Sequence, residues 1–189
     1  MDGHTLLPVT VIAAIGIFFA REILEAIRRR MANGRKRHAL RLLLAAECER
    51  NQWFIKWMRR NIEKALECEA DMVIEVRKKP AGYDVLTISG EKMLSSSAMP
   101  NVTIHSTDKY LFEAASVDPK LFNALEAVAA HLPVLSHLRQ GLIEHVADDR
   151  EWLSAWGEYA REELDDVESS LKALYLVCTG KAEVPHRVR

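Results

Sequence analysis

The side chains that could carry out chemistry are spread along this sequence and are not grouped. Three histidines, His131, His137 and His145, fall on one predicted helix. The outer two would lie about 21 Å apart along that helix, so they cannot share one metal ion. Glu162 and Asp166 are one helical turn apart and could share a cation, but acidic clusters on amphipathic helices are usually solvated faces. We therefore expect no metal site.

Nucleophilic and phosphate-binding residues also lack the neighbours that catalysis requires. The Gly-Glu-Lys run at 90–92 has no second glycine at the spacing of a phosphate-binding loop. The serine run at 95–97 has no base nearby in the sequence. Cys48, Cys68 and Cys178 have neither CxxC nor ligand spacing, and we interpret them as buried free thiols in a reducing compartment. We expect no catalytic residue and no cofactor, and we do not expect an enzyme.

One pair of polar residues, Glu47 and Asn51, interrupts an apolar helical stripe. A half-buried carboxylate requires a hydrogen-bonding partner, and Asn51, Arg50 or a facing helix could supply it. The pair would either fix the register of its helix or form the polar floor of a ligand or partner groove. Trp53 and Trp57 flank the same stripe and form the candidate partner surface if they are exposed, whereas buried tryptophans would belong to the core.

The helices that must position these residues follow an N-terminal segment without charged residues, Thr5–Ala20. A bilayer core about 30 Å thick requires about 20 apolar residues, and this segment would extend for about 24 Å as a helix. An apolar stripe continues through Ile23, Leu24, Ile27 and Met31, which extends the helix into the headgroup region. We therefore predict that the segment spans a membrane.

Three other interpretations of this segment differ in what they require. A cleaved signal peptide needs a basic start and a small-x-small cleavage site, and neither is present before Arg21. A helix lying in the membrane plane needs a polar face, which residues 5–20 lack. A buried helix of a soluble domain is compatible with the short length of the run.

A dense basic segment follows the apolar one and predicts its orientation. Positive residues mark the cytoplasmic side, so the N-terminus should lie outside the cytosol and the remaining chain inside. Residues 1–60 carry a net charge of 12 − 5 = +7 and residues 61–189 a net charge of 14 − 22 = −8, so we expect no nucleic-acid partner. A nucleic-acid-binding patch is the competing interpretation of this basic run, but a neighbouring membrane span explains it more simply. The predicted membrane-surface residues are Arg28, Arg29, Arg30, Arg35, Lys36 and Arg37.

The chain length suggests one domain with an appendage. Asn33-Gly34 predicts a helix stop that separates an anchor, residues 1–34, from a helical bundle, residues 35–180, and residues 181–189 form a flexible tail. Long helices are predicted at 36–71, from Pro119, and from Asp148 or Asp149 to Gly180, with a short helix at 107–116 capped by Thr107 or Asp108.

An insertion at residues 72–106 should interrupt the helices. Two β-branched runs, 72–76 and 83–88, predict a hairpin around the Lys-Lys-Pro-Ala-Gly turn at 78–82. Residues 102–105 could add a third strand, and residues 90–101 are predicted to form an irregular loop.

The sequence therefore predicts a mainly α protein: a single transmembrane helix and a cytosolic antiparallel helical bundle with a small β-hairpin insertion. We expect a membrane-anchored interaction module, scaffold or accessory, on the cytosolic face of a bacterial inner membrane. Its expected partners are the lipid bilayer, a protein of unknown identity, and a second copy of the chain. The alternative is a membrane-perturbing effector, for example of a phage-defence system, whose anchor oligomerises on triggering. An enzyme with an unrecognised site is a third hypothesis.

Overall fold

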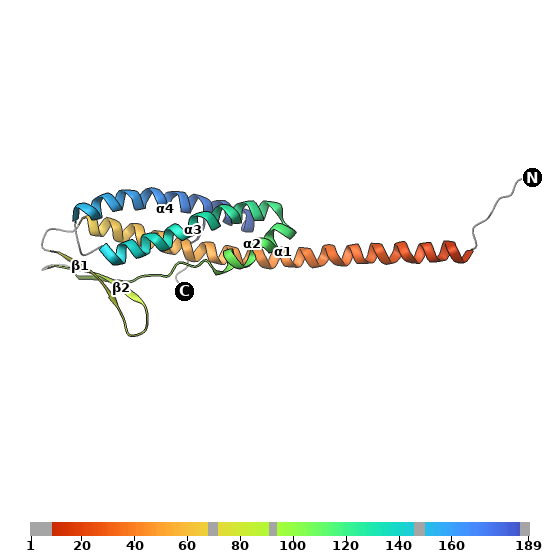
Figure 1. Cartoon of the computed structure of the whole chain (residues 1–189), viewed down its shortest axis with the longest axis horizontal. Coiled ribbons are helices and arrows are strands. Elements are labelled where there is room, and N and C mark those ends of the chain that lie inside the picture. Colours follow the sequence, from red (N-terminus) through yellow and green to blue (C-terminus); the bar gives the residue numbers. More distant parts are fainter. Residues whose placement is uncertain (1–8, 68–71, 91–93, 146–149, 186–189) are drawn as a thin grey trace, which may run out of the picture. The chain divides into compact units, whose positions relative to one another are not determined.

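The computed structural model describes residues 9–67, 72–90, 94–145 and 150–185, which are mainly helical (Figure 1). The chain divides into two compact units, one ending at Ala39 and one starting at Leu40, and the first helix contributes to both. The helices are α1 (Val9–Leu66), α2 (His105–Val117), α3 (Pro119–His145) and α4 (Arg150–Thr179), and the strands are β1 (Val73–Lys78), β2 (Asp84–Ser89) and β3 (Leu94–Ala98).

Helix α1 continues through Asn33 and Gly34, so the predicted helix stop is wrong. About a third to a half of helices end with a residue in the left-handed conformation, and in the described residues only Gly82 and Gly180 have positive φ. A glycine inside a helix costs about 1 kcal/mol relative to alanine, which a long helix tolerates.

In the unit that starts at Leu40, α3 and α4 pack beside the second half of α1 and form the predicted helical bundle (Figure 1). Apolar residues at helical spacing on all three helices face one shared core. Among its largest fully buried side chains are Phe54, Ile55 and Met58 of α1 and Leu132, Leu135 and Leu138 of α3.

One described helix, α3, is long and apolar enough to cross a membrane. Its leucines Leu125, Leu132 and Leu135 are fully buried, so this composition is also that of a core helix. The predicted anchor begins outside the described residues. Its described part belongs to α1, and the residues from Val11 to Ala20 are all exposed.

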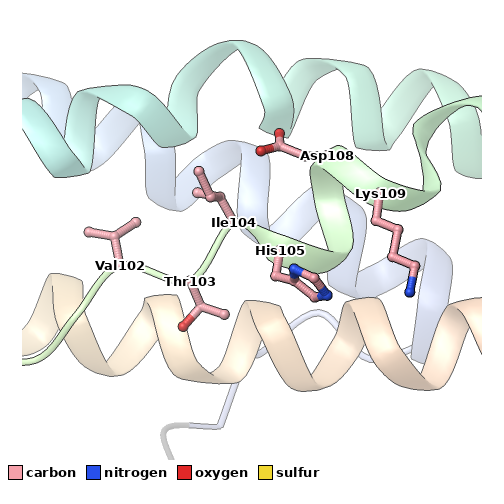
Figure 2. A pocket seen from close by; sticks show the side chains of 6 residues that line it. All are labelled: Val102, Thr103, Ile104, His105, Asp108 and Lys109. Carbon is pink, nitrogen blue, oxygen red and sulfur yellow. The ribbon is translucent and has the colours of Figure 1, made fainter.

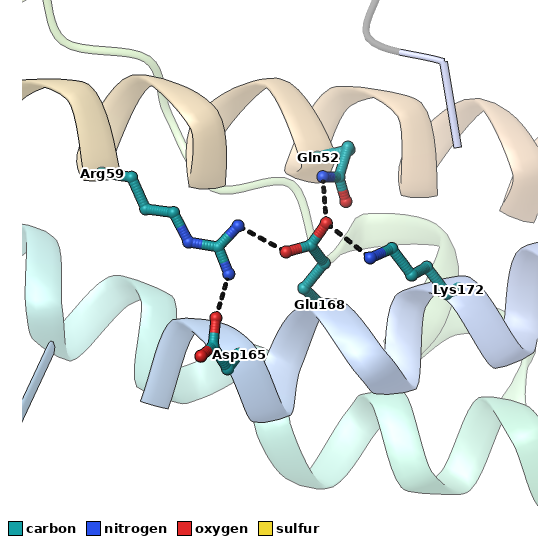
Figure 3. A network of polar contacts seen from close by, with 5 residues as sticks. All are labelled: Gln52, Arg59, Asp165, Glu168 and Lys172. Carbon is teal, nitrogen blue, oxygen red and sulfur yellow. Dashed lines mark hydrogen bonds and ion pairs between the residues drawn. The ribbon is translucent and has the colours of Figure 1, made fainter. Parts of the chain in front are cut away.

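A polar network joins α1 to α4 (Figure 3). Glu168 of α4 accepts hydrogen bonds from Gln52 and Arg59 of α1 and from Lys172 of its own helix, and Arg59 also pairs with Asp165. Burial by itself would raise the pKa of Glu168, but the hydrogen bonds from Lys172, Arg59 and Gln52 outweigh this effect and hold the pKa at about 2.

We expect the substitution Glu168→Gln to reduce the acid sensitivity of the bundle. Because the pKa of Glu168 is lower in the folded chain than the ordinary value of about 4.3, its stabilising effect is complete above about pH 5 and is lost as the pH falls toward 2. Urea unfolding at a series of pH values should therefore show a shallower loss of stability in the variant. Glu162→Gln, at an exposed position on α4, should keep the parental slope. Equal slopes for the parent and Glu168→Gln would contradict the prediction.

The insertion forms a three-stranded antiparallel sheet in the order β1-β2-β3. The predicted hairpin is confirmed: β1 pairs with β2 from Val73↔Ser89 to Lys78↔Asp84. The loop predicted at 90–101 is wrong in part, because residues 94–98 form β3 and Thr87 pairs with Ser96. Serines are weak strand formers, but this edge strand is also tied to α1, where Trp57 and Lys64 donate hydrogen bonds to Ser97 and Ser95.

The ends of the later helices follow local rules. Asp118 precedes the predicted Pro119 start of α3, and its carboxylate accepts a hydrogen bond from the Leu121 amide. Gly180 ends α4 with φ of +76°, as predicted. Beyond it Val184 is buried in the core, which differs from the flexible tail expected there. The cap predicted at residues 148–149 lies outside the described residues.

Candidate partner-binding groove

The buried carboxylate of Glu47 caps a helix that follows it much later in the sequence. It accepts hydrogen bonds from the backbone amides of Ser106 (2.7 Å) and Thr107 (3.0 Å) and from the Thr107 hydroxyl (2.7 Å). These amides belong to the first turn of α2, where amides have no partner within the helix. The predicted cap at Thr107 or Asp108 is therefore wrong: the N-cap residue is Ile104, which makes no side-chain cap bond, and Glu47 replaces it.

Asn51, one turn further along α1, holds the chain just before α2. Its side chain donates to the Thr103 carbonyl oxygen (2.6 Å) and accepts from the Thr103 amide (2.9 Å). This pairing occupies both backbone polar atoms of Thr103, so residues 102–104 lie along α1 and do not form the third strand that the sequence suggested.

Glu47 and Asn51 thus fix the segment 99–107 against α1. Both side chains are buried, and their partners are backbone groups of this segment and the Thr107 hydroxyl, not the neighbouring Arg50 that the sequence offered. The pair therefore does not form a groove floor. It positions the wall of a groove that lies on the adjacent face of α1.

The groove has a volume of about 590 Å³. One face of α1 supplies its floor, where the small residues Ala45 and Ala46 leave room above the helix. The held segment forms one side, and the C-terminal end of α4 forms the other. Its lining residues are Leu42, Ala45, Ala46, Glu49, Arg50, Trp53, Asn101, Thr103 and Thr179.

The two candidate tryptophans have different environments. Trp53 is half-buried and lines the groove. Trp57 is only 8% exposed, packs near Phe54 and donates its indole N–H to Ser97 (3.0 Å). Trp53 therefore lines a groove, and its role as a partner surface stays a prediction, whereas Trp57 holds the sheet against α1.

Two charged residues give the groove its polarity. The Glu49 carboxylate accepts a hydrogen bond from the Tyr175 hydroxyl of α4 (3.2 Å), which also ties that wall to the floor. Arg50 is exposed and has no hydrogen bond or ion pair within the described part of the chain. The groove therefore combines an apolar floor, an aromatic end and one available guanidinium group, which suits an amphipathic segment of another protein.

A shallower hollow of about 530 Å³ lies beside the start of α2 (Figure 2). Its lining side chains come from residues 102–105 and the first turn of α2. His105 and Lys109 point to one side, and Asp108 points to the other (Figure 2). Because Glu47 already occupies the amides of Ser106 and Thr107, the first turn of α2 has fewer free donors for an anion.

The other residues that could do chemistry are dispersed in the structure. His131 hydrogen-bonds Ser170, and within the described ranges no three His, Cys, Asp or Glu side chains gather at one point. Burial raises the pKa of the Cys178 thiol to about 12 and raises the pKa of Cys48 well above its usual value. Such thiols are poor nucleophiles at neutral pH.

Sequence reasoning missed most of the groove. Its floor is an Ala-Ala pair that resembles any helical surface, and its walls come from residues about 50 and 130 positions away along the chain. No family model matches this chain, and no curated protein or solved structure is significantly similar to it.

Proposed function

We propose that this chain is a single-span membrane protein that presents a partner-binding groove on the cytosolic side of a bacterial inner membrane. The observation that carries the proposal is the exposure of apolar residues in the first turns of α1. Ile12, Ile17, Phe18 and Phe19 are 58 to 71% exposed. A contiguous exposed apolar surface requires an apolar environment, and a lipid bilayer supplies one. This exposure favours a membrane span over a buried helix.

The basic residues that follow support the orientation. The six predicted membrane-surface residues between Arg28 and Arg37 lie on the exposed part of α1, on the C-terminal side of the apolar stretch. Positive residues are retained on the cytosolic side, so the unit that starts at Leu40 would be cytosolic. The residues closest to the apolar stretch, such as Arg21, can reach the lipid phosphates.

The groove gives the cytosolic unit its interaction surface. It is concave and lined largely by apolar groups. It has one half-buried tryptophan and one arginine without a partner among the described residues, and both residue types are enriched at interfaces. A protein segment is therefore a better fit than a metal ion or a nucleotide.

One crosslinking experiment in intact cells tests both parts of the proposal. A photoreactive amino acid is placed at Ala46 in the groove and, as a matched control, at exposed Glu162 on α4. After illumination and lysis, the full chain should sediment with the membranes and resist alkaline extraction. The Ala46 position should give a discrete protein adduct, and the Glu162 position should not. Recovery in the supernatant would refute the membrane span, and identical or absent adducts would refute the groove.

A further inference from the structure

The part of α1 that follows the apolar stretch carries an uncovered apolar seam. Leu24, Ile27 and Met31 are 55%, 49% and 62% exposed. Their spacing of three and then four residues places them on one side of the helix, in the a-d-a pattern of a coiled coil. Three large side chains at this spacing and exposure form a continuous stripe that another helix would bury.

Arginines border this seam on both sides. With Leu24 and Met31 at the a positions, Arg28 and Arg35 occupy e positions and Arg30 occupies a g position. None of these three has a hydrogen bond or an ion pair among the described residues. By contrast, Arg29 on the opposite side of the helix donates to Glu25 at 2.5 Å. Arg28, Arg30 and Arg35 therefore remain available to a partner along the seam.

Lipid headgroups cannot cover the whole seam if the hydrocarbon region ends near Ala20, as the proposed function has it. On a helix that runs along the membrane normal, Ile27 lies about 10 Å and Met31 about 16 Å beyond Ala20. The polar layer on each side of the hydrocarbon is only about 5–8 Å thick. Met31 and Arg35 therefore lie beyond the headgroup region that the sequence suggested for this stripe, where a helix of another protein would bury the exposed Met31 side chain.

A second copy of the chain is a poor partner for this seam. In a parallel pair of identical helices, the g position of one chain faces the following e position of the other. Arg30 would therefore meet Arg35 twice, and like charges at these positions destabilise the pair.

We propose that the seam binds the juxtamembrane helix of a different single-span protein. That helix would carry leucine or isoleucine at its a and d positions and Asp or Glu at its e and g positions. This inference rests on the proposed function for the membrane geometry, but it concerns a surface separate from the groove and names the chemistry of its partner.

A peptide-binding assay tests this surface with the full chain in nanodiscs of phosphatidylcholine, a neutral lipid. The probe is a fluorescent three-heptad synthetic peptide with Ile and Leu at a and d and Glu at e and g. A matched peptide has Lys at e and g. Fluorescence anisotropy should show at least tenfold tighter binding of the Glu peptide than of the Lys peptide.

Three double variants identify the residues responsible. Ile27→Ser with Met31→Ser should weaken Glu-peptide binding at least tenfold. Arg28→Glu with Arg35→Glu leaves Arg30 on the other side of the seam and should abolish the preference for the Glu peptide. Arg29→Glu with Lys36→Glu makes the same change in net charge away from the seam and should keep the parental preference.

Several results would overturn the inference. These are equal binding of the two peptides, the same loss in both charge-reversal variants, or no effect of the seam substitutions. Loss of binding when phosphatidylglycerol is included in the discs would assign the arginines to anionic headgroups instead. Failure of the chain to enter nanodiscs, seen by size exclusion, would count against the membrane span alone. The peptides would then be titrated against the chain in solution, and the same binding results would support or overturn the proposed peptide-binding seam.

Discussion

Replacing Glu47 with alanine should lower the unfolding free energy of the bundle by about 3 kcal/mol. The substitution removes three hydrogen bonds to a buried carboxylate and leaves the amides of Ser106 and Thr107 without their acceptor. It also creates a cavity between α1 and α2. Urea titration of the full chain in detergent, followed by tryptophan fluorescence, measures this effect because all four tryptophans lie beyond residue 50.

Two matched variants make the result specific. Glu47→Gln keeps the side-chain volume and one acceptor oxygen, so it should lose about half as much stability as the alanine variant. Glu158→Ala removes an exposed carboxylate from α4 and should stay within about 0.5 kcal/mol of the parent. If Glu47→Ala were as stable as Glu158→Ala, the capping role of Glu47 would be wrong.

Two lysines in the apolar stretch should move the protein from the membrane to the soluble fraction. Ile12 and Ile15 are exposed residues near the middle of the predicted span. A lysine at the centre of a membrane helix costs about 3 kcal/mol in insertion, so Ile12→Lys with Ile15→Lys costs about 6 kcal/mol, which is a factor of about 10⁴ in the insertion equilibrium. Ultracentrifugation of lysed cells, with immunoblotting of pellet and supernatant, measures the distribution.

The control places the same two charges on apolar residues outside the stretch. Phe112 on α2 and Leu94 on β3 are 86% and 78% exposed, more than either isoleucine. Phe112→Lys with Leu94→Lys should leave the protein in the pellet. If both double variants sedimented alike, apolar exposure in residues 11–20 would not be the cause of membrane association.

The sequence was informative where structure depends on local pattern. Periodic apolar residues predicted the helices of the bundle, and the turn composition at 78–82 predicted the β1–β2 hairpin, because these features follow from neighbouring side chains. It was misleading where tertiary contacts override propensity. The serines of β3 form a strand because β2 offers an edge and α1 supplies two donors, and neither is visible in a short window.

The candidate site could be predicted only in part for the same reason. The position of Glu47 and Asn51 on an apolar stripe showed that they needed partners, but the partners lie 52 to 60 residues away. Trp53 and Trp57 are one helical turn apart, so their spacing alone does not show which of the two is more exposed. Their environments differ because β3 covers Trp57, and that strand was not predicted.

The way in which the segment 99–107 is held against α1 also has a kinetic consequence. Both backbone polar atoms of Thr103 are held by one side chain, Asn51, and not by a neighbouring strand. Releasing that amide requires the loss of two hydrogen bonds, whereas the amides of α3 are released only when the core opens. Deuterium should therefore enter the Thr103 amide sooner than the amides of α3, because Asn51 can release Thr103 while the helical core stays closed.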